Sequence, residues 1–212
     1  MKIEIVRATE IPNELLKLAC DHTMVAEPTE GKSASQELID FLIKADHMSV
    51  FEHCKITFKI SEVSRSLMAQ LTRHRAGVFT CQSQHYQNYG DVPAIKTGDE
   101  SLDMAIEKAY YAYSSACERG IVKEVARQVL PNAASVNILW TVDARNLYNF
   151  IVMRLCERNV PEMVTFAYNL RAQACSWWPE LFEEAGPHCY THGCCNQGKM
   201  QAAQCKKVKL CN

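Results

Sequence analysis

Residues 143 to about 183 constrain the fold most strongly, because they carry apolar side chains around nearly the whole surface of a helix. A helix that is apolar on all sides is stable only when other elements cover it, so we expect this segment at the centre of the protein. Asn159, Pro161 and Glu162 form a pattern typical of a helix start. The sequence therefore predicts two consecutive central helices.

Three stretches alternate apolar and polar residues, as half-buried strands do. They are KIEIV at residues 2–6, KITFKI at residues 55–60 and ASVNILWTV at residues 134–142. Helical patterns separate them at residues 12–19, 34–45 (with a capping box from Ser33 to Gln36), 64–75, 102–118 and 121–129. This order, without a repeat or linker, predicts a single α+β domain with a small mixed or antiparallel sheet and long central helices.

The formal net charge of −1 excludes a global basic field that would attract nucleic acid or anionic membrane. The N-terminal sequence lacks the apolar core of a signal peptide, and no run of about 18 apolar residues is present. We therefore expect a cytoplasmic protein that binds neither membranes nor nucleic acid. Any anion that it binds must be met by a local cluster of cations.

Arginine side chains occur where packing alone would favour apolar residues. The triplet at residues 73–75, RHR, follows an apolar segment, where its charges could simply stabilise the helix dipole. Arg127 and Arg154 lie among apolar residues. An arginine in such a place either extends its head to water or pairs with an anion, since an unpaired buried charge is costly. Both interpretations stay open for each residue taken singly.

Amide side chains accompany these guanidinium groups. Gln70 lies three residues before Arg73, and Arg145 lies four residues before Asn149, so each pair shares one helix face. Guanidinium groups match phosphates and carboxylates, while amides match the edges of pyrimidine or flavin rings. The set suits a nucleotide. Neither GxGxxG nor a P-loop pattern is present, which argues against an ordinary Rossmann or Walker site.

The triplet is followed, after seven residues, by Ser83, and this spacing resembles the RHR-x7-S motif of the flavin-dependent thymidylate synthases, also called thymidylate synthase complementing proteins. Upstream, HMSVFEHCKITFKISEVSRSLMAQLTRHR is similar to the family's approach to the motif. Later blocks, ARQVLP, WTVDARNLYNFIVMR and SWWPELFEEAG, follow in the family's order. The resemblance covers residues 1–187, which we expect to form one domain, with residues 188–212 as a Cys-rich tail.

The resemblance implies the fold of that family and a methyltransferase of dTMP biosynthesis. Its members are homotetrameric flavoproteins that hold FAD at subunit interfaces and convert dUMP to dTMP. Methylenetetrahydrofolate gives the carbon, and NADPH reduces the flavin. Reduced flavin delivers a hydride to the pyrimidine, so no enzyme cysteine need attack the ring. Arginine donors would stabilise negative charge that builds on the pyrimidine.

Carried over by position, the resemblance assigns roles to a set that we call the predicted site residues. The catalytic residues would be Arg154, Ser83 and His47. The cofactor-binding residues would be Arg73, His74, Arg75, Ser49, Arg145 and Asn149. The substrate-binding residues would be Gln70, Ser83, His85, Arg127 and Arg154. His47 would stand near the mouth of the folate or flavin site, and Arg154 would reach the pyrimidine.

The chain departs from the family pattern around the nucleotide. His85 replaces an arginine, and histidine is only partly charged at neutral pH. Thr80 and Cys81 stand where relatives commonly have Asn and Glu, and Asp143 stands where Asn is usual. A related flavin- and folate-dependent reaction on a pyrimidine deoxynucleotide, such as hydroxymethylation of dUMP or dCMP, therefore stays open. So does a covalent role for Cys81, beside a passive place in a strand.

The cysteines fall into two groups. Those with apolar neighbours read as reduced core thiols, namely Cys20, Cys54, Cys81, Cys117, Cys156 and Cys175. In the tail, Cys189, Cys194, Cys195 and Cys205, with His192, are candidate zinc ligands, although their spacing is looser than paired CxxC. A reduced tail without metal and a redox role are the alternatives. A non-catalytic zinc or nucleic-acid-binding module is the competing class of function.

Overall fold

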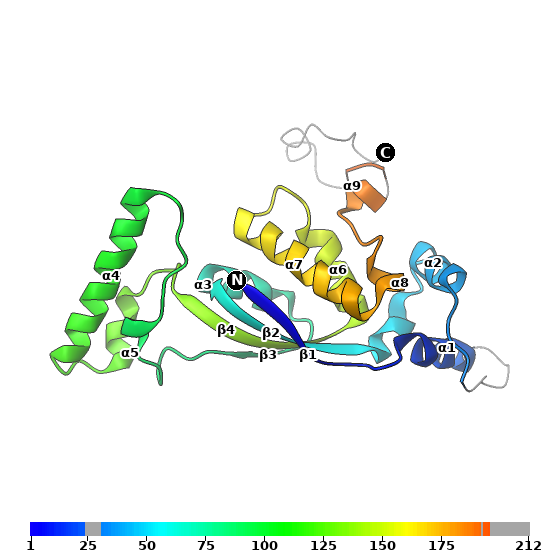
Figure 1. The fold of residues 1–212 in the computed structure, drawn as a ribbon, viewed down its shortest axis with the longest axis horizontal. Helices are drawn as coiled ribbons and strands as arrows, with labels where there is room; N and C mark the ends of the chain where they lie inside the picture. The colour runs from blue at the N-terminus through cyan, green and yellow to red at the C-terminus, as the bar shows by residue number, and fades with distance from the viewer. Residues whose placement is uncertain (24–30, 192, 196–212) are drawn as a thin grey trace. The chain divides into compact units, whose positions relative to one another are not determined.

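The structure, a computed structural model, describes residues 1–23, 31–191 and 193–195. Within these ranges the chain forms an α+β fold, as the sequence predicts. The strands of this part, β1 (Lys2–Ala8), β2 (Lys55–Ser64), β3 (Val78–Cys81) and β4 (Ser135–Asp143), form an antiparallel sheet in the order β1-β2-β4-β3 (Figure 1). All three predicted strands are therefore present, and β3 is the strand that extends from the RHR triplet toward Ser83.

The chain divides into two compact units, each described by itself below. Unit 1 comprises residues 1–2 and 59–140. Unit 2 comprises the described residues of 3–58 and those from 141 onward. Strands β2 and β4 contribute residues to both units, and most of the predicted strand alternation lies in these two strands.

Strand β2 has one buried and one exposed face. Ile56, Phe58 and Ile60 are buried, whereas Lys55 and Lys59 are exposed. In β4 the buried positions also alternate, at Val136, Ile138, Trp140 and Val142. Full burial of one large apolar side chain contributes about 1.5–3 kcal/mol, so the register of these strands is strongly determined.

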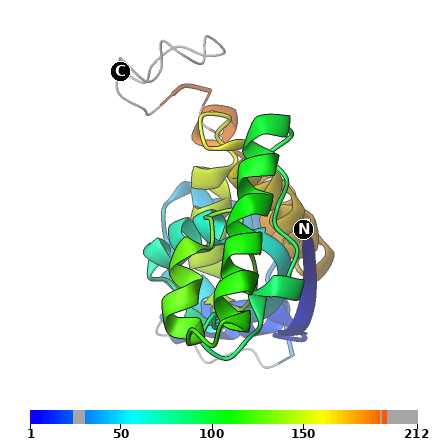
Figure 2. The same cartoon turned by 90° about the vertical axis from the view of Figure 1, so that its left-hand side faces the viewer.

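The helices of unit 1 are α3 (Arg65–Leu71), α4 (Glu100–Glu118) and α5 (Lys123–Ala126), with 3₁₀ turns η2 (Thr72–His74), η3 (Tyr89–Asp91) and η4 (Arg127–Val129). Helices α4 and α5 lie side by side (Figure 2). Helix α4 begins two residues before the predicted start, because the Asp99 side chain caps it by accepting from the backbone N–H of Leu102 at 2.9 Å.

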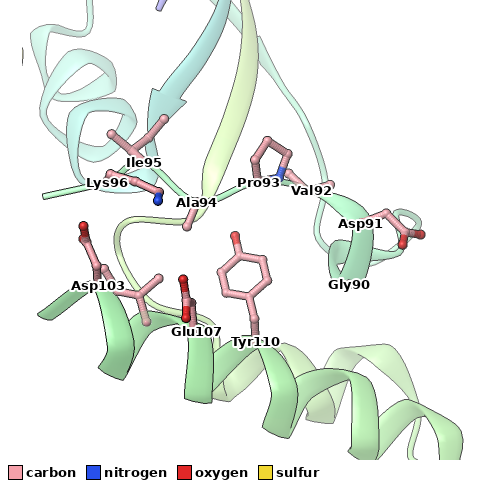
Figure 3. Close-up of a pocket in the computed structure, with 11 residues that line it drawn as sticks. Gly90, Asp91, Val92, Pro93, Ala94, Ile95, Lys96, Asp103, Glu107 and Tyr110 are labelled. Carbon is pink, nitrogen blue, oxygen red and sulfur yellow. The ribbon is translucent and has the colours of Figure 1, made fainter. Parts of the chain in front are cut away.

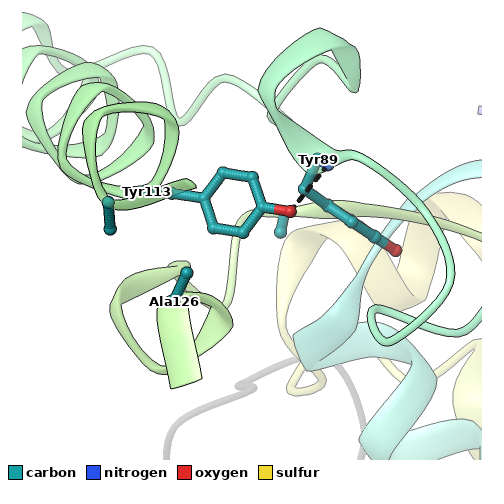
Figure 4. Packing of buried hydrophobic residues seen from close by; sticks show 5 residues of the cluster. Tyr89, Tyr113 and Ala126 are labelled. Atoms are coloured by element: carbon teal, nitrogen blue, oxygen red, sulfur yellow. Dashed lines mark hydrogen bonds between the residues drawn. The ribbon is translucent and has the colours of Figure 1, made fainter. Parts of the chain in front are cut away.

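Tyrosine and alanine side chains form a buried cluster in unit 1 (Figure 4). Tyr113 and Ala116 come from α4 and Ala126 comes from α5, while Tyr89 and Ala134 come from flanking segments. The backbone N–H of Tyr89 donates to the Tyr113 hydroxyl at 3.2 Å. Small alanines let the backbones approach closely, and the cluster thereby fixes α5 and η4, which carry Arg127, against α4.

The described helices of unit 2 are α1 (Pro12–His22), α2 (Gln36–Lys44), α6 (Ala144–Arg154), α7 (Pro161–Trp177), α8 (Pro179–Phe182) and α9 (His188–Thr191), with a 3₁₀ helix η1 (Met48–His53). Helices α6 and α7 correspond to the two predicted helices, but they are not covered on all sides, because Met153 of α6 and Tyr168 of α7 are 56% and 53% exposed. Phe150 of α6 and Phe166 of α7 are both buried and pack edge to face, with ring centroids 5.9 Å apart.

Two capping predictions differ from the structure. Helix α2 is capped by Ser35, which accepts from the backbone N–H of Leu38 at 3.3 Å, and not by Ser33. The residue at the N-cap position of α7 is Val160, whose side chain forms no capping hydrogen bond. Asn159 is therefore not the cap of this helix. In both cases the observed boundary lies one or two residues from the predicted one, a difference that the pattern alone cannot resolve.

None of the helices in the described part of the chain combines the length and hydropathy that crossing a bilayer requires.

Candidate functional site

The RHR triplet lies at the end of α3, in unit 1. The helix begins at Ser64, whose hydroxyl accepts from the backbone N–H of Leu67 at 3.0 Å. It continues as the 3₁₀ turn η2 and stops at Arg75, whose φ of 52° is left-handed. That conformation favours glycine and costs other residues roughly 1–2 kcal/mol. A bulky arginine at such a position is an uncommon choice, and it turns the chain sharply after the triplet.

The segment after the triplet is anchored to β4. The indole N–H of Trp140 donates to the backbone carbonyl of Ala76 at 3.0 Å, and Phe79 stacks on the Trp140 ring with centroids 5.5 Å apart and 9° between planes. Arg73 and Arg75 are exposed while His74 is half-buried. The backbone is therefore fixed on both sides of the triplet, and both guanidinium groups remain accessible to a ligand.

Ser83 and His85 form a compact turn after β3. The Ser83 hydroxyl accepts from the backbone N–H of His85 at 3.1 Å. The His85 ring meets the edge of Tyr86, with centroids 4.3 Å apart, and its Nδ1 lies 2.9 Å from the Glu124 carboxylate of α5. This contact connects the Ser83 segment with the helix that leads directly into Arg127. Arg127 itself is exposed at the start of η4.

The predicted site residues of unit 2 lie mainly on α6. Asp143 caps this helix by accepting from the backbone N–H of Asn146 at 2.9 Å and from its side-chain amide at 2.8 Å. Arg145 is half-exposed and pairs with the Glu52 carboxylate of η1, while Asn149 is exposed. Arg145 thus has an acidic partner that the sequence did not reveal.

Arg154, the last residue of α6, is half-buried. Its Nη1 donates to the side-chain oxygen of Asn159 at 3.1 Å. Burial lowers the pKa of the Arg154 guanidinium, but an arginine remains charged in proteins at neutral pH. Arg154 therefore keeps its positive charge, and the contact with Asn159 fixes the position of its guanidinium group at the end of α6.

His47 and Ser49 lie at the start of η1, and both are exposed. The backbone N–H of His47 donates to the Leu42 carbonyl at 2.8 Å, and its ring faces the edge of Phe41 at 6.2 Å. These contacts fix the backbone at this turn while leaving the imidazole accessible.

The predicted site residues divide between the units. Unit 1 holds Gln70, Arg73, His74, Arg75, Ser83, His85 and Arg127, whereas unit 2 holds His47, Ser49, Arg145, Asn149 and Arg154. Within unit 1, the contact of His85 with Glu124 brings the Ser83 turn to α5. Within unit 2, α6 carries three members of the set. Gln70 is half-buried on α3, one turn before Arg73.

Sequence reasoning did not find Glu52, Glu124 or the true contacts of Asn159. Glu52 and Glu124 are exposed acidic residues distant in sequence from their partners, so no local pattern identifies them. The sequence predicts Asn159 as a helix cap, but its side-chain amide donates to the backbone carbonyls of Met153, Arg154 and Cys156, at and just after the end of α6. An asparagine just after a helix that ends in arginine is the signal that could have indicated this role.

A cavity of about 360 Å³ lies in unit 1 between the segment 90–96 and α4 (Figure 3). None of the predicted site residues lines it. Its charged groups are Lys96, Asp91, Asp103 and Glu107. The Asp103 carboxylate accepts from the backbone N–H and the hydroxyl of Thr97, and these bonds lower its pKa. Three carboxylates and one ammonium would repel a phosphate, so this cavity does not suit a nucleotide.

Four of the predicted core thiols have a raised pKa. Burial raises the pKa of the Cys81 thiol, although the nearby Arg65 cation opposes this shift. Burial also raises the pKa of Cys20, of Cys175 and, to about 12, of Cys54. A thiol with a raised pKa has little thiolate at neutral pH, which disfavours Cys81 as a covalent nucleophile.

The predicted zinc site stays a prediction. Over residues 1–23, 31–191 and 193–195, no group of three or more His, Cys, Asp and Glu side chains is arranged to hold a metal ion. Cys195 is present as a free thiol in these ranges. His192 and Cys205 lie outside the described residues, so the complete candidate set, which also includes Cys194, is not represented.

Comparison with known proteins gives a consistent result. Residues 4–180 match the family model of the thymidylate synthase complementing proteins. A flavin-dependent thymidylate synthase from Geobacter sulfurreducens is 32% identical over 225 aligned positions, covering 99% of this chain and 97% of that protein. One from Clostridium tetani is 30% identical, with the same shares of both chains covered.

A solved structure shows the same fold. The flavin-dependent thymidylate synthase from Helicobacter pylori, complexed with FAD and dUMP, superposes with a TM-score of 0.76. It is 18% identical in sequence, and the match covers 87% of this chain and 99% of that one. With the family model spanning most of the chain and relatives aligned along nearly its whole length, the protein belongs to the thymidylate synthase complementing protein family, the flavin-dependent thymidylate synthases.

Proposed function

We propose that the protein methylates dUMP to dTMP in an FAD-dependent reaction, with methylenetetrahydrofolate as carbon donor and NADPH as reductant. Relatives named for this activity align with nearly the whole chain, which supports the proposal. The structural observation that carries it is the exposure of Arg73 and Arg75 directly after α3, with Arg75 held at a φ of 52°. An exposed side chain gains little from packing, so packing does not explain an arginine in this costly conformation, whereas binding of a ligand does.

The residues assigned to FAD suit that cofactor chemically. The exposed groups of Arg73 and Arg75 can each donate paired hydrogen bonds to a phosphate. Arg145 adds a third guanidinium, partly compensated by Glu52, and the exposed amide of Asn149 offers a donor and an acceptor to a ring edge. His74 and Ser49 complete the set. FAD, when bound and reduced, supplies a hydride.

The residues assigned to the nucleotide provide donors for an anion. Because the Ser83 oxygen already accepts from the His85 backbone, its own O–H remains to donate to the ligand. Arg127 is exposed, and Gln70 offers an amide. Arg154, oriented by Asn159, stabilises negative charge that develops on the pyrimidine. His47, exposed on η1, serves at the mouth of the folate or flavin site.

The proposal extends to assembly and organisation. A cytoplasmic homotetramer, with folate binding and a domain formed by residues 1–187, follows from the family resemblance. In the same proposal, residues 188–212 are the Cys-rich C-terminal part of the sequence. Sedimentation analysis of the purified protein tests the tetramer, and equilibrium binding of methylenetetrahydrofolate tests the folate site.

Hydroxymethylation of dUMP or dCMP is the second candidate function. The sequence feature that favours it is His85, at a position where the family resemblance implies an arginine. An imidazole has at most two N–H donors, whereas a guanidinium has five, so this exchange would alter how the site holds the nucleotide.

One experiment separates the candidates. Purified protein is mixed with FAD, dUMP, methylenetetrahydrofolate and NADPH, and the nucleotide product is identified by mass, with dCMP in a parallel reaction. We expect dTMP from dUMP. In the dUMP reaction a product heavier than dTMP by one oxygen would support hydroxymethylation, and in the dCMP reaction a product heavier than dCMP by one CH2O unit would support it. A protein that neither binds FAD nor oxidises reduced flavin with any pyrimidine nucleotide would contradict the enzyme. Arg73→Ala, which removes one exposed guanidinium, is the matched variant.

A further inference from the structure

Glu124 makes a specific contact with His85 that the reaction as proposed does not explain. The carboxylate Oε1 lies 2.9 Å from Nδ1 of the imidazole. The side chains are 38% (His85) and 47% (Glu124) exposed, so water screens the pair and it contributes little to stability. A contact of this kind can nonetheless fix the orientation of a ring, because Nδ1 is held at one point while Tyr86 meets the ring at its edge.

The contact determines which imidazole nitrogen faces a ligand. With Nδ1 directed to Glu124, only Nε2 remains, and the described residues provide it with no hydrogen-bond partner. In the imidazolium form both nitrogens donate, one to each anionic partner. His85 can therefore bridge the Glu124 carboxylate and a second anion.

The surroundings favour an anion at Nε2. Arg127 is three residues after Glu124, in the turn that directly continues α5, and it is exposed. The Ser83 hydroxyl, which accepts from the His85 backbone, keeps its own proton for donation. The titratable groups that contact His85 in the described chain are Glu124 from α5 and Tyr86 from its own segment.

We propose that Glu124 is a positioning residue that holds His85 so that its Nε2 donates to the phosphate of the nucleotide substrate. This inference rests on the proposed function, in which His85, Ser83 and Arg127 bind dUMP. In this arrangement the His85–Glu124 pair takes the place of an arginine. An arginine carries its own fork of donors and needs no carboxylate to orient it, whereas a histidine donates in the right direction only when its other nitrogen is fixed.

The test compares Glu124→Ala and Glu124→Gln in the full-length protein, with Glu118→Ala as a matched control. Glu118 is an exposed acidic residue at the end of α4 and is not among the predicted site residues. We expect Glu124→Ala to raise the KM for dUMP about 5- to 20-fold, while kcat and the affinity for FAD change less than about twofold. Glu124→Gln should lie between, because its amide oxygen still accepts from Nδ1–H. Glu118→Ala should have no effect.

Repeating the Glu124 substitution in a His85→Arg variant tests whether the role of Glu124 is merely structural. In His85→Arg, the guanidinium donates without help from Glu124, so adding Glu124→Ala should change the KM for dUMP less than about twofold. An equal increase of KM in both backgrounds, a loss confined to kcat, or no change in any variant would overturn the inference.

A binding experiment distinguishes failure of the proposed function from failure of the role proposed for Glu124. Equilibrium dialysis of the wild-type protein with radiolabelled dUMP in the presence of FAD measures nucleotide binding without turnover. If the wild type binds FAD but no pyrimidine nucleotide, both proposals fall. If the wild type makes dTMP and Glu124→Ala does so with an unchanged KM, only the role of Glu124 falls.

Discussion

Arg154 and Asn159 hold each other across the turn between α6 and α7. The guanidinium Nη1 of Arg154 donates to the side-chain oxygen of Asn159 at 3.1 Å. The amide nitrogen of Asn159 lies 3.0–3.2 Å from the backbone carbonyls of Met153, Arg154 and Cys156. One side chain therefore both ends α6, by satisfying its last carbonyls, and fixes the direction of the arginine assigned to the pyrimidine.

Asn159→Ala should remove both interactions. We expect the free energy of unfolding to fall by about 1–2 kcal/mol, because carbonyls at the helix end lose their donor, and kcat/KM for dUMP to fall roughly tenfold. Asn159→Asp keeps an acceptor for Arg154 but loses the donors, so it should lose stability and retain most of the activity. Denaturant titrations and kinetics at a temperature where both variants are folded measure this. Equal losses of activity would mean that Asn159 acts only through the turn.

Substitutions of Arg75 can separate the energetic cost of its backbone conformation from the contribution of its side chain to FAD binding. Because its φ is 52°, Arg75→Gly should be as stable as the wild type, or more stable by up to about 1 kcal/mol. The same variant should bind FAD roughly tenfold more weakly, since a phosphate loses a guanidinium. Arg75→Lys, which keeps the charge but not the fork, should fall between. FAD titrations followed by visible absorption measure the affinity, and unchanged FAD binding in Arg75→Gly would contradict the assignment.

The fold was predictable where the pattern is periodic. The alternation in β2 and β4 and the apolar helices α6 and α7 follow from residues two, three or four positions apart, which the chain itself records. The family assignment was also available from sequence, because the RHR triplet and Ser83 stand at a fixed spacing. Local periodicity and motif spacing are both properties of short segments.

The partners of the predicted site residues were not predictable. Glu52 with Arg145, and Glu124 with His85, join residues far apart in sequence, and any exposed acidic residue would have been an equal candidate. The choice of Ser35 over Ser33 as the cap of α2 depends on the exact residue at which the chain enters the helix. Such details are determined by tertiary structure, so local sequence patterns do not contain them.

Asp143 tests whether the cap of α6 supports the cofactor site. Asparagine caps a helix about as well as aspartate, so Asp143→Asn should change the free energy of unfolding by less than about 0.5 kcal/mol. Asp143→Ala loses the bond from the backbone N–H of Asn146 and should cost about 1 kcal/mol. It should also weaken FAD binding, since Arg145 and Asn149 lie in the first two turns. A fully active and equally stable Asp143→Ala would contradict this.

Cys81 distinguishes a covalent mechanism from a flavin-dependent one. Since burial raises the pKa of its thiol, little thiolate is present at pH 7–8, and alkylation by iodoacetamide should be slow. Cys81→Ala should retain kcat within about twofold. A nucleophile removed from a covalent mechanism would instead cost about 10³-fold or more. Steady-state rates of dTMP formation decide between these outcomes, with Cys117→Ala as a matched removal of a partly buried thiol.

Cys54 should make the protein sensitive to alkaline pH. Burial raises the pKa of this thiol from 9.0 to about 12 in the folded protein, and its Sγ lies 3.6 Å from the Pro12 carbonyl. Below pH 9 the thiol is protonated in both states, so its contribution to stability is fully present. Between pH 9 and about 12 the unfolded chain ionises while the folded chain does not, so stability is lost as pH rises, by about 1.4 kcal/mol per pH unit.

Cys54→Ala should remove this dependence while lowering stability at neutral pH, because it leaves a small cavity. Other groups that titrate at alkaline pH, including Tyr110, act equally in both proteins. The difference between the two proteins in free energy of unfolding, measured by urea titration from pH 8 to 11, therefore isolates the thiol. That difference should shrink as the pH rises above 9. A difference that stays constant over this range would mean that Cys54 ionises as readily in the folded chain as in the unfolded one.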